Sequence, residues 1–172
     1  MTEFTKYLSL KLDSSKENLY VISDETGKRE LHSYNLADDK QVKVTAEQEN
    51  VKNYWFEADG LLIATDYNGN EREQLTHHAG NKTEKLTDDD AYYHHYGVYL
   101  NGAFIYLRNQ KNGKTFDLIA GKDVIHTFDG HVSIISKFDD SRLLMSSAVN
   151  NIDKRLFLFD LKTKTAADID FP

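Results

Sequence analysis

The chain has 172 residues, a composition typical of a soluble globular protein, and a formal net charge of −7. The acidic balance disfavours a nucleic-acid partner, because phosphate backbones select clustered Lys and Arg. The absence of cysteine excludes disulfides, thiolate nucleophiles and cysteine-based zinc sites. No apolar stretch approaches the ~20 residues that cross a bilayer, and residues 1–6 lack signal-peptide character, so the sequence predicts a cytoplasmic protein without a membrane partner.

The first part of the chain divides into four short segments of strand character, separated by polar turns. Residues 7–12 alternate apolar and polar side chains, and residues 19–23 form an almost continuous apolar run, as in a strand covered on both faces. Residues 30–36 are ambiguous with a short helix by spacing alone, but their length and the flanking turn residues favour a strand. Residues 41–45 close the unit.

The same plan recurs along the rest of the chain. The segment 19–24 returns at 61–66, 103–108 and 143–148, with a spacing of 42 residues between the first two copies. Such a spacing is typical of stacked or radially arranged units. It predicts a single all-β domain, a β-propeller of four four-stranded blades, with the approximate bounds 4–45, 52–87, 92–128 and 132–171. A barrel or a sandwich is the competing all-β fold, but neither requires the same turn to recur.

These units carry a family resemblance. Residues 12–24 resemble the S-P-D-G-K-x-I-A-F-x-S-D core of TolB-type propeller repeats, and residues 27–36 resemble the G-x-x-x-I-Y-x-x-D-L strand that follows it. The further matching stretches are 44–45, 86–87, 138–144 and 158–165. The usual proline of the turn is missing from every copy, and the glycine of the D-G pair remains only in Asp59-Gly60 and Asn101-Gly102.

Repeats of this type form the N-terminal propeller of prolyl oligopeptidase-like serine peptidases and also occur in periplasmic TolB-like proteins. The absence of an export signal favours the first resemblance, which implies a propeller of about seven or eight blades covering a separate α/β-hydrolase domain. No Gly-x-Ser-x-Gly motif is present, so the resemblance implies a partial propeller without the catalytic domain. A small closed four-bladed ring is the alternative, with residues 4–12 pairing with the final strand.

Two histidine pairs, His77-His78 and His94-His95, flank the acidic run 88–90 and raise the question of a zinc site. Neighbouring residues on a strand point to opposite faces, so each pair offers only one histidine to a shared site. We therefore expect no metal and no other cofactor. We also expect no catalytic residue, because no nucleophile on a strained turn beside a base is indicated.

Two dense aromatic runs, at residues 53–56 and 92–96, are the candidates for a binding surface. The residues proposed for it are Tyr54, Trp55, Tyr92, Tyr93, His94, His95 and Tyr96. Aromatic side chains commonly dominate binding surfaces. The alternative is that they begin inner strands and pack between blades, because exposed apolar patches are uncommon.

Two functions stay open at this point. The first is a non-catalytic propeller segment that restricts access to the active site of a prolyl oligopeptidase-like serine peptidase and helps to bind the peptide. The second is a stand-alone TolB-like scaffold that binds a protein or peptide. In a partial propeller the terminal blades expose faces and strand edges, which also predicts a homodimer through those blades.

Overall fold

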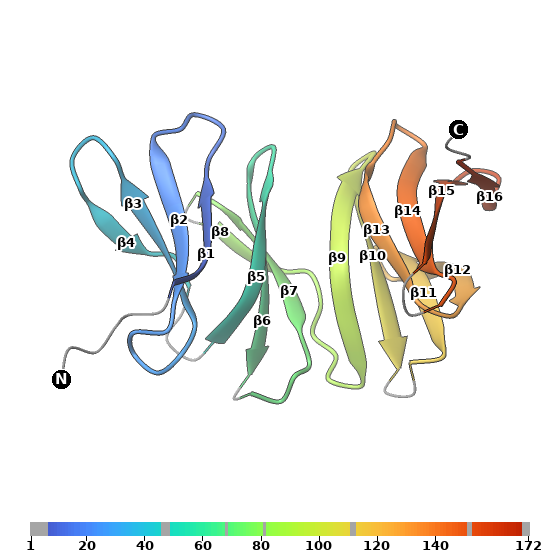
Figure 1. Cartoon of the computed structure of the whole chain (residues 1–172), viewed down its shortest axis with the longest axis horizontal. Helices are drawn as coiled ribbons and strands as arrows, with labels where there is room; N and C mark the ends of the chain where they lie inside the picture. The colour runs from blue at the N-terminus through green and yellow to red at the C-terminus, as the bar shows by residue number, and fades with distance from the viewer. Residues whose placement is uncertain are drawn as a thin grey trace. The chain divides into compact units, whose positions relative to one another are not determined.

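The computed structural model describes residues 7–45, 49–67, 69–80, 82–110, 113–150 and 153–169. Over these residues the chain forms sixteen strands and no helix, and the strands make four antiparallel sheets of four strands each (Figure 1). Each sheet is a meander of strands that follow one another in the sequence, and we call the sheets blades 1 to 4. The predicted all-β architecture of four-stranded blades is therefore confirmed.

The four blades have the same strand order and similar strand lengths. Blade 1 contains β1 (Tyr7–Leu12), β2 (Asn18–Ser23), β3 (Glu30–Asn35) and β4 (Gln41–Lys43). Blade 2 contains β5 (Glu49–Glu57), β6 (Gly60–Tyr67), β7 (Gln74–Ala79) and β8 (Lys82–Lys85). Blade 3 contains β9 (Tyr92–Leu100), β10 (Ala103–Gln110), β11 (Thr115–Ala120) and β12 (Asp123–Asp129). Blade 4 contains β13 (Val132–Lys137), β14 (Arg142–Ala148), β15 (Lys154–Asp160) and β16 (Thr165–Asp168).

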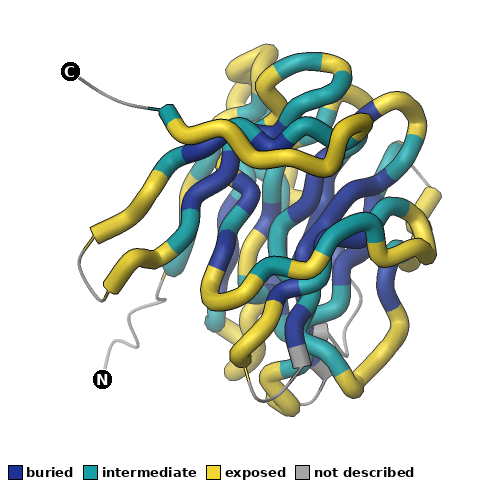
Figure 2. Tube along the Cα trace, turned by 90° about the vertical axis from the view of Figure 1, so that its right-hand side faces the viewer, coloured by how far each residue is buried: buried dark blue, intermediate teal, exposed yellow. Residues whose placement is uncertain are grey.

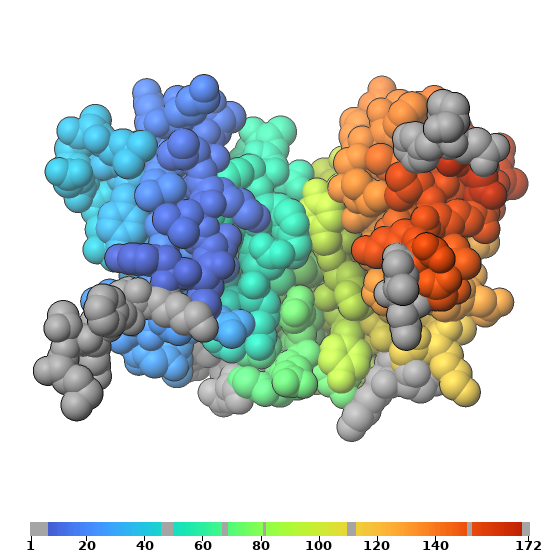
Figure 3. All heavy atoms as spheres, in the orientation of Figure 1, coloured from blue at the N-terminus to red at the C-terminus, as the bar shows by residue number. Residues whose placement is uncertain are grey.

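The chain divides into two compact units, residues 1–88 with blades 1 and 2 and residues 89–172 with blades 3 and 4. In unit 1, one face of blade 1 packs against one face of blade 2. The core residues of unit 1 are Ile22, Leu31, Val51, Tyr54, Leu61 and Ile63. In Figure 3, atoms of β1 and β2 (blue) lie against atoms of β5 (teal) on the visible face of this unit. Alternation along each strand sends every second side chain into this core.

Unit 2 repeats the arrangement with a larger core. Its residues are Val98, Leu100, Ile105, Leu107, Phe116, Leu118, Val132, Ile134, Leu143, Met145, Phe157 and Phe159. The first six belong to blade 3 and the others to blade 4, so the core lies between the two blades. In Figure 2, buried segments (dark blue) occupy the middle of the strands and exposed segments (yellow) the turns.

The hairpin turns explain several short polar motifs. Asn101 and Gly102 both have positive φ, 53° and 77°, and connect the paired residues Leu100 and Ala103, as in a two-residue type I′ hairpin. In blade 1, the Asp13 carboxylate accepts hydrogen bonds from the backbone N–H groups of Glu17 and Asn18. This aspartate holds a turn that lacks the proline of the TolB-type repeat.

The third copy of the repeat is shifted by one residue from the alignment expected from the sequence. That alignment placed Ala103 opposite Leu61. In the structure, Phe56 pairs with Leu61 and Tyr99 pairs with Phe104. Each of these pairs is the second pair counted from its hairpin turn, so Phe104 is the counterpart of Leu61. Leu61 faces the core that blade 2 shares with blade 1, whereas blade 3 turns its other face, with Ile105 and Leu107, to the core that it shares with blade 4. Phe104 therefore lies on the face of blade 3 opposite the core of unit 2.

The ends of the predicted blades are only partly within the described residues. Residues 4–6 and 170–171 lie outside them, and β5 begins at Glu49 rather than at residue 52. β1 pairs with β2 and β16 pairs with β15, in place of the shared sheet that was considered for a closed four-bladed ring. The described residues contain no helix long and apolar enough to cross a membrane.

Candidate functional site

The first aromatic run lies on β5, and the structure places Tyr54 in the core of unit 1 rather than on a surface. The Tyr54 side chain is fully buried, and its hydroxyl donates a hydrogen bond of 2.9 Å to the backbone carbonyl of Tyr20. The Lys11 ammonium lies 4.4 Å from the centroid of its ring. Alternation sends Tyr54 toward blade 1, whereas Trp55 lies on the opposite face of β5 and is half-buried.

The second aromatic run lies on β9, where it contributes to both faces of blade 3. His94 is buried, with its ring 6.5 Å from that of Tyr92 and 5.9 Å from that of Tyr106. The Arg108 guanidinium lies 4.1 Å from the Tyr92 ring centroid, in a cation–π arrangement. Tyr93 and Tyr96 are half-buried.

His95 points to the other face of blade 3, as expected for the strand neighbour of His94. Its ring lies 5.3 Å from that of Phe116, which is in turn 5.0 Å from the ring of His131, and its Nε2 forms a hydrogen bond with the side-chain oxygen of Asn109. Burial lowers the pKa of His95; the Asn109 hydrogen bond opposes this effect and the nearby His131 adds to it. His95 therefore contributes to the packing between blades 3 and 4.

Gly97 follows the second run, at a position where the strands approach too closely for a side chain. A Cβ atom at Gly97 would lie 2.4 Å from the carbonyl oxygen of Ile105 and 2.7 Å from the ring of Phe104. The Phe104 ring stacks on Tyr106 at 5.3 Å and lies 5.2 Å from the Tyr99 ring. A glycine here lets the aromatic rings cover the backbone of β9.

The residues predicted to form one binding surface therefore belong to two different units of the chain. Tyr54 and Trp55 belong to unit 1, and the run from Tyr92 to Tyr96 belongs to unit 2. Among the described residues, no group of three or more His, Asp or Glu side chains is arranged to hold a metal ion. Within unit 1, His77 Nε2 lies 3.2 Å from the Asp59 carboxylate, which places this histidine in an ion pair when it is protonated.

Unit 1 also contains a cleft that sequence reasoning missed. It lies between blades 1 and 2 and has a volume of about 480 Å³. The residues that line this inter-blade cleft are Asp13, Ser14, Tyr20, Val42, Lys43, Val44, Phe56, Glu57, Gly60, Leu61, His78 and Gly80. Its size is within the range of ligand-binding sites.

Strand register decides which side chains face the cleft. Tyr20 pairs with Ser33 and Ser33 with Val42, which places Tyr20 and Val42 on the core face of blade 1. Phe56 pairs with Leu61 and Leu61 with His78, which places all three on the core face of blade 2. The Tyr20 and Phe56 rings meet edge to face with centroids 5.3 Å apart. The cleft therefore has aromatic and aliphatic walls.

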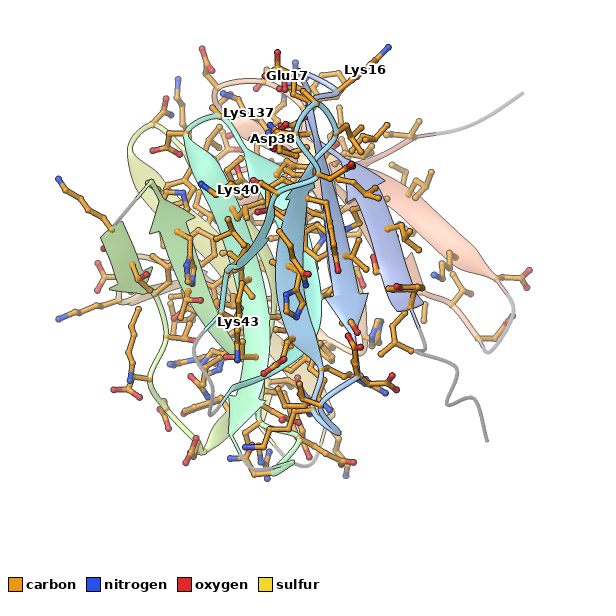
Figure 4. All side chains as sticks on the ribbon, turned by 90° about the vertical axis from the view of Figure 1, so that its left-hand side faces the viewer. Lys16, Glu17, Asp38, Lys40, Lys43 and Lys137 are labelled. Atoms are coloured by element: carbon orange, nitrogen blue, oxygen red, sulfur yellow. The ribbon has the colours of Figure 1, made fainter. Side chains whose placement is uncertain are left out.

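Two charged residues that line the cleft, Lys43 and Glu57, direct their charged groups to the opposite faces of their sheets. Lys43 pairs with His32 on the face of blade 1 away from the core, and its Nζ lies 2.5 Å from Glu30 Oε1. Figure 4 shows Lys43 on β4 and Lys40 in the turn before it. Glu57 follows Phe56 and points to the opposite face of β5, where burial raises its pKa and His77 opposes that effect.

Three polar groups remain at the cleft. The Asp13 carboxylate has a lowered pKa, chiefly through the hydrogen bond from the Asn18 side chain. Burial raises the pKa of the Tyr20 hydroxyl, and the nearby Asp13 charge adds to this effect. Burial, together with the neighbouring His77, lowers the pKa of His78, which favours the neutral form of its imidazole. Among the residues that line the cleft, the charge presented to it is that of Asp13.

The aromatic run at residues 53–56 reaches this cleft through Phe56, but the rest of the cleft could not be predicted, because its other walls come from β2, β4, β6 and the end of β7. In the sequence, nothing distinguishes Tyr20 or Val42 from any other residue of a β-strand. Two wall positions, Gly60 and Gly80, have no side chain at all. At Gly60 a Cβ atom would lie 2.0 Å from the His78 carbonyl oxygen, so glycine is required by the approach of β7.

Comparison with known proteins identifies the fold. No family model matches the sequence, and no curated protein matches it. Among solved structures, a prolyl endopeptidase has a TM-score of 0.67 and 10% identity, and the match covers 96% of this chain and 26% of that chain. TolB from Acinetobacter baumannii has a TM-score of 0.64 and 14% identity, with 95% of this chain and 43% of that chain covered.

A third similar structure is an oligogalacturonate lyase in complex with manganese, with a TM-score of 0.66, 13% identity, and coverage of 97% of this chain and 54% of that chain. This chain thus spans about a quarter of the prolyl endopeptidase and about half of the lyase. At these identities the likeness concerns the fold. The four blades have the architecture of a β-propeller domain of the prolyl oligopeptidase and TolB type.

Proposed function

We propose that this chain is a non-catalytic propeller segment of a cytoplasmic, prolyl oligopeptidase-like serine peptidase. In this role it restricts the access of peptides to a hydrolase domain and contacts the peptide that enters. The observation that supports the proposal is the likeness to a prolyl endopeptidase over 96% of this chain but only 26% of that protein. The bond-breaking chemistry would then belong to the remaining part of such a protein.

The packing of the blades suits a role in restricting access. Each unit has a core between two blades, with Leu31, Tyr54, Leu118 and Met145 fully buried. Close-packed cores of this kind resist deformation, so a blade pair acts as a rigid wall. Size exclusion by a wall requires rigidity rather than a reactive group.

A second candidate function is a stand-alone scaffold that binds a peptide or protein. Two observations favour it: the likeness to TolB, and the inter-blade cleft that blades 1 and 2 form without any further chain. In both candidates the surface of blade 1 away from the core has a role. Tyr7, Leu10 and Leu12 there are 56%, 56% and 48% exposed, which suits contact with a hydrolase domain or with a second copy.

The native polypeptide separates the two candidates. An antibody raised against this chain would be used to isolate the protein from its own cells for mass and peptide mapping. A polypeptide well above 19.8 kDa that contains an α/β-hydrolase sequence supports the peptidase segment. A native polypeptide of 19.8 kDa contradicts it and favours the scaffold.

A hydrolysis assay tests the non-catalytic role that both candidates share. The purified 172-residue chain would be incubated with chromogenic proline-containing peptides. We expect no product above the buffer blank. Turnover that is abolished by replacing one serine would contradict both candidates.

A further inference from the structure

We infer that the inter-blade cleft of unit 1 is a binding site for one cationic side chain, an arginine presented by a peptide or protein partner. This inference goes beyond the proposed function, since blades 1 and 2 form the cleft whether or not a hydrolase domain is attached. It stands on the aromatic walls, on the charge at the cleft and on the shape of the cleft.

The aromatic walls offer π surfaces to a cation. Tyr20 and Phe56 meet at an interplanar angle of 81°, and Phe56 is 36% exposed although it lies beside the core. Tyr54 belongs to the same cluster, with centroids 6.3 Å from Tyr20 and 6.0 Å from Phe56. Lys11 already lies over the Tyr54 ring and donates a hydrogen bond to the Tyr54 carbonyl, so this cluster holds one cation of the chain itself.

The charge at the cleft is complementary to a cation. Asp13 carries the negative charge, while Lys43 is paired with Glu30 and Glu57 points to the opposite face of its sheet. Asp13 Oδ1 accepts hydrogen bonds from Ser15, Glu17 and Asn18, and Oδ2 accepts one from Asn18 Nδ2. A carboxylate oxygen has two lone pairs, so Oδ2 can accept a further charge-assisted hydrogen bond from a ligand.

The shape of the cleft suits arginine better than lysine. Val42, Val44 and Leu61 supply aliphatic surface for a side-chain stem, and Gly60 and Gly80 leave parts of the wall without side chains. A guanidinium group is planar, stacks on aromatic faces and is weakly hydrated, whereas an ammonium is a compact and strongly hydrated charge. The same side chain can therefore stack on Phe56 or Tyr20 and donate to Asp13.

The test compares two ligands of equal shape, acetyl-arginine amide and acetyl-citrulline amide, which differ in charge. Both would be titrated into the full chain at low salt, with amide chemical shifts recorded by NMR. We expect arginine to shift the amide signals of Gly60, Gly80 and His78, and to bind at least about tenfold more tightly than citrulline. Equal binding of the two ligands, or shifts confined to other residues, would overturn the inference.

Variants locate the site independently of the ligand pair. Phe56→Ala should weaken arginine binding about tenfold or more, because it removes one π surface. The matched control is Phe138→Ala in blade 4, an exposed phenylalanine with Arg142 over its ring, which should leave binding unchanged. Retained binding in Phe56→Ala, with a fold confirmed by circular dichroism, would also overturn the inference. Since Asp13 also holds its own turn, the citrulline comparison and not an Asp13 variant tests the charge.

Discussion

Replacing Leu31 by alanine tests whether the core of unit 1 lies between two blades. Leu31 is fully buried on β3 and belongs to the cluster that joins blade 1 to Tyr54 and Ile63 of blade 2. Removing three carbons at about 0.8 kcal/mol each costs about 2.4 kcal/mol. The cavity left behind raises the expected loss in the free energy of unfolding to about 3 kcal/mol.

Urea unfolding followed by tryptophan fluorescence measures this loss, because Trp55 is the single tryptophan and lies in unit 1. With a slope of about 2 kcal/mol per molar urea, the midpoint should fall by about 1.5 M. The matched control is Leu36→Ala, at a turn residue that is 53% exposed, which should change stability by less than about 0.5 kcal/mol. If the two variants unfold at the same midpoint, blade 1 does not pack on blade 2 as described.

Three further predictions concern backbone approach and protonation. Gly97→Ala should lower the free energy of unfolding by about 3 kcal/mol, because its Cβ would meet backbone atoms of β10. Gly27→Ala, with φ of +82° and open space, should cost only about 1 kcal/mol, and equal thermal shifts for the two variants would refute this. The Arg142 side chain, with the backbone of Ser141, holds the pKa of Asp139 at about 2, so the stabilisation from this turn should be complete above pH 4 and lost as the pH falls through about 2. Thermal melts of Asp139→Asn should therefore differ from wild type at pH 7 and converge below pH 2; a constant difference would contradict this. Burial lowers the pKa of His95, so its protonation favours the unfolded chain, and stability should fall as the pH drops below the unfolded value of about 6.5. His95→Gln should flatten that slope in melts between pH 7 and pH 5, and an unchanged slope would show that His95 is not responsible.

The repeat in the sequence was enough to predict four-stranded blades, because turn residues and apolar runs recur at a regular spacing. It was not enough to assign faces. The one-residue shift at Phe104 follows from the strand pairing on either side of the Asn101-Gly102 hairpin, which the alignment of apolar runs does not contain. The bulges beside Tyr106 and between Val51 and Asn53 change the alternation in the same way.

The candidate site was harder to predict than the fold for a physical reason. The aromatic run at residues 53–56 indicated a binding surface, but the sequence could not tell that Tyr54 is buried in the core while Phe56 lines the cleft. Whether an aromatic side chain is buried depends on the blade that packs over it, and that contact is not local in the sequence. His78, from a strand two places along the meander, reaches the same cleft for the same reason.

The most direct test of the blade architecture is a methyl NOE experiment on the full chain. The structure predicts cross-peaks from the methyl groups of Ile22 or Leu31 to those of Val51 or Ile63 in unit 1. It likewise predicts cross-peaks from Leu107 or Leu118 to Ile134 or Met145 in unit 2. Cross-peaks confined to methyl groups within a single blade would contradict the account.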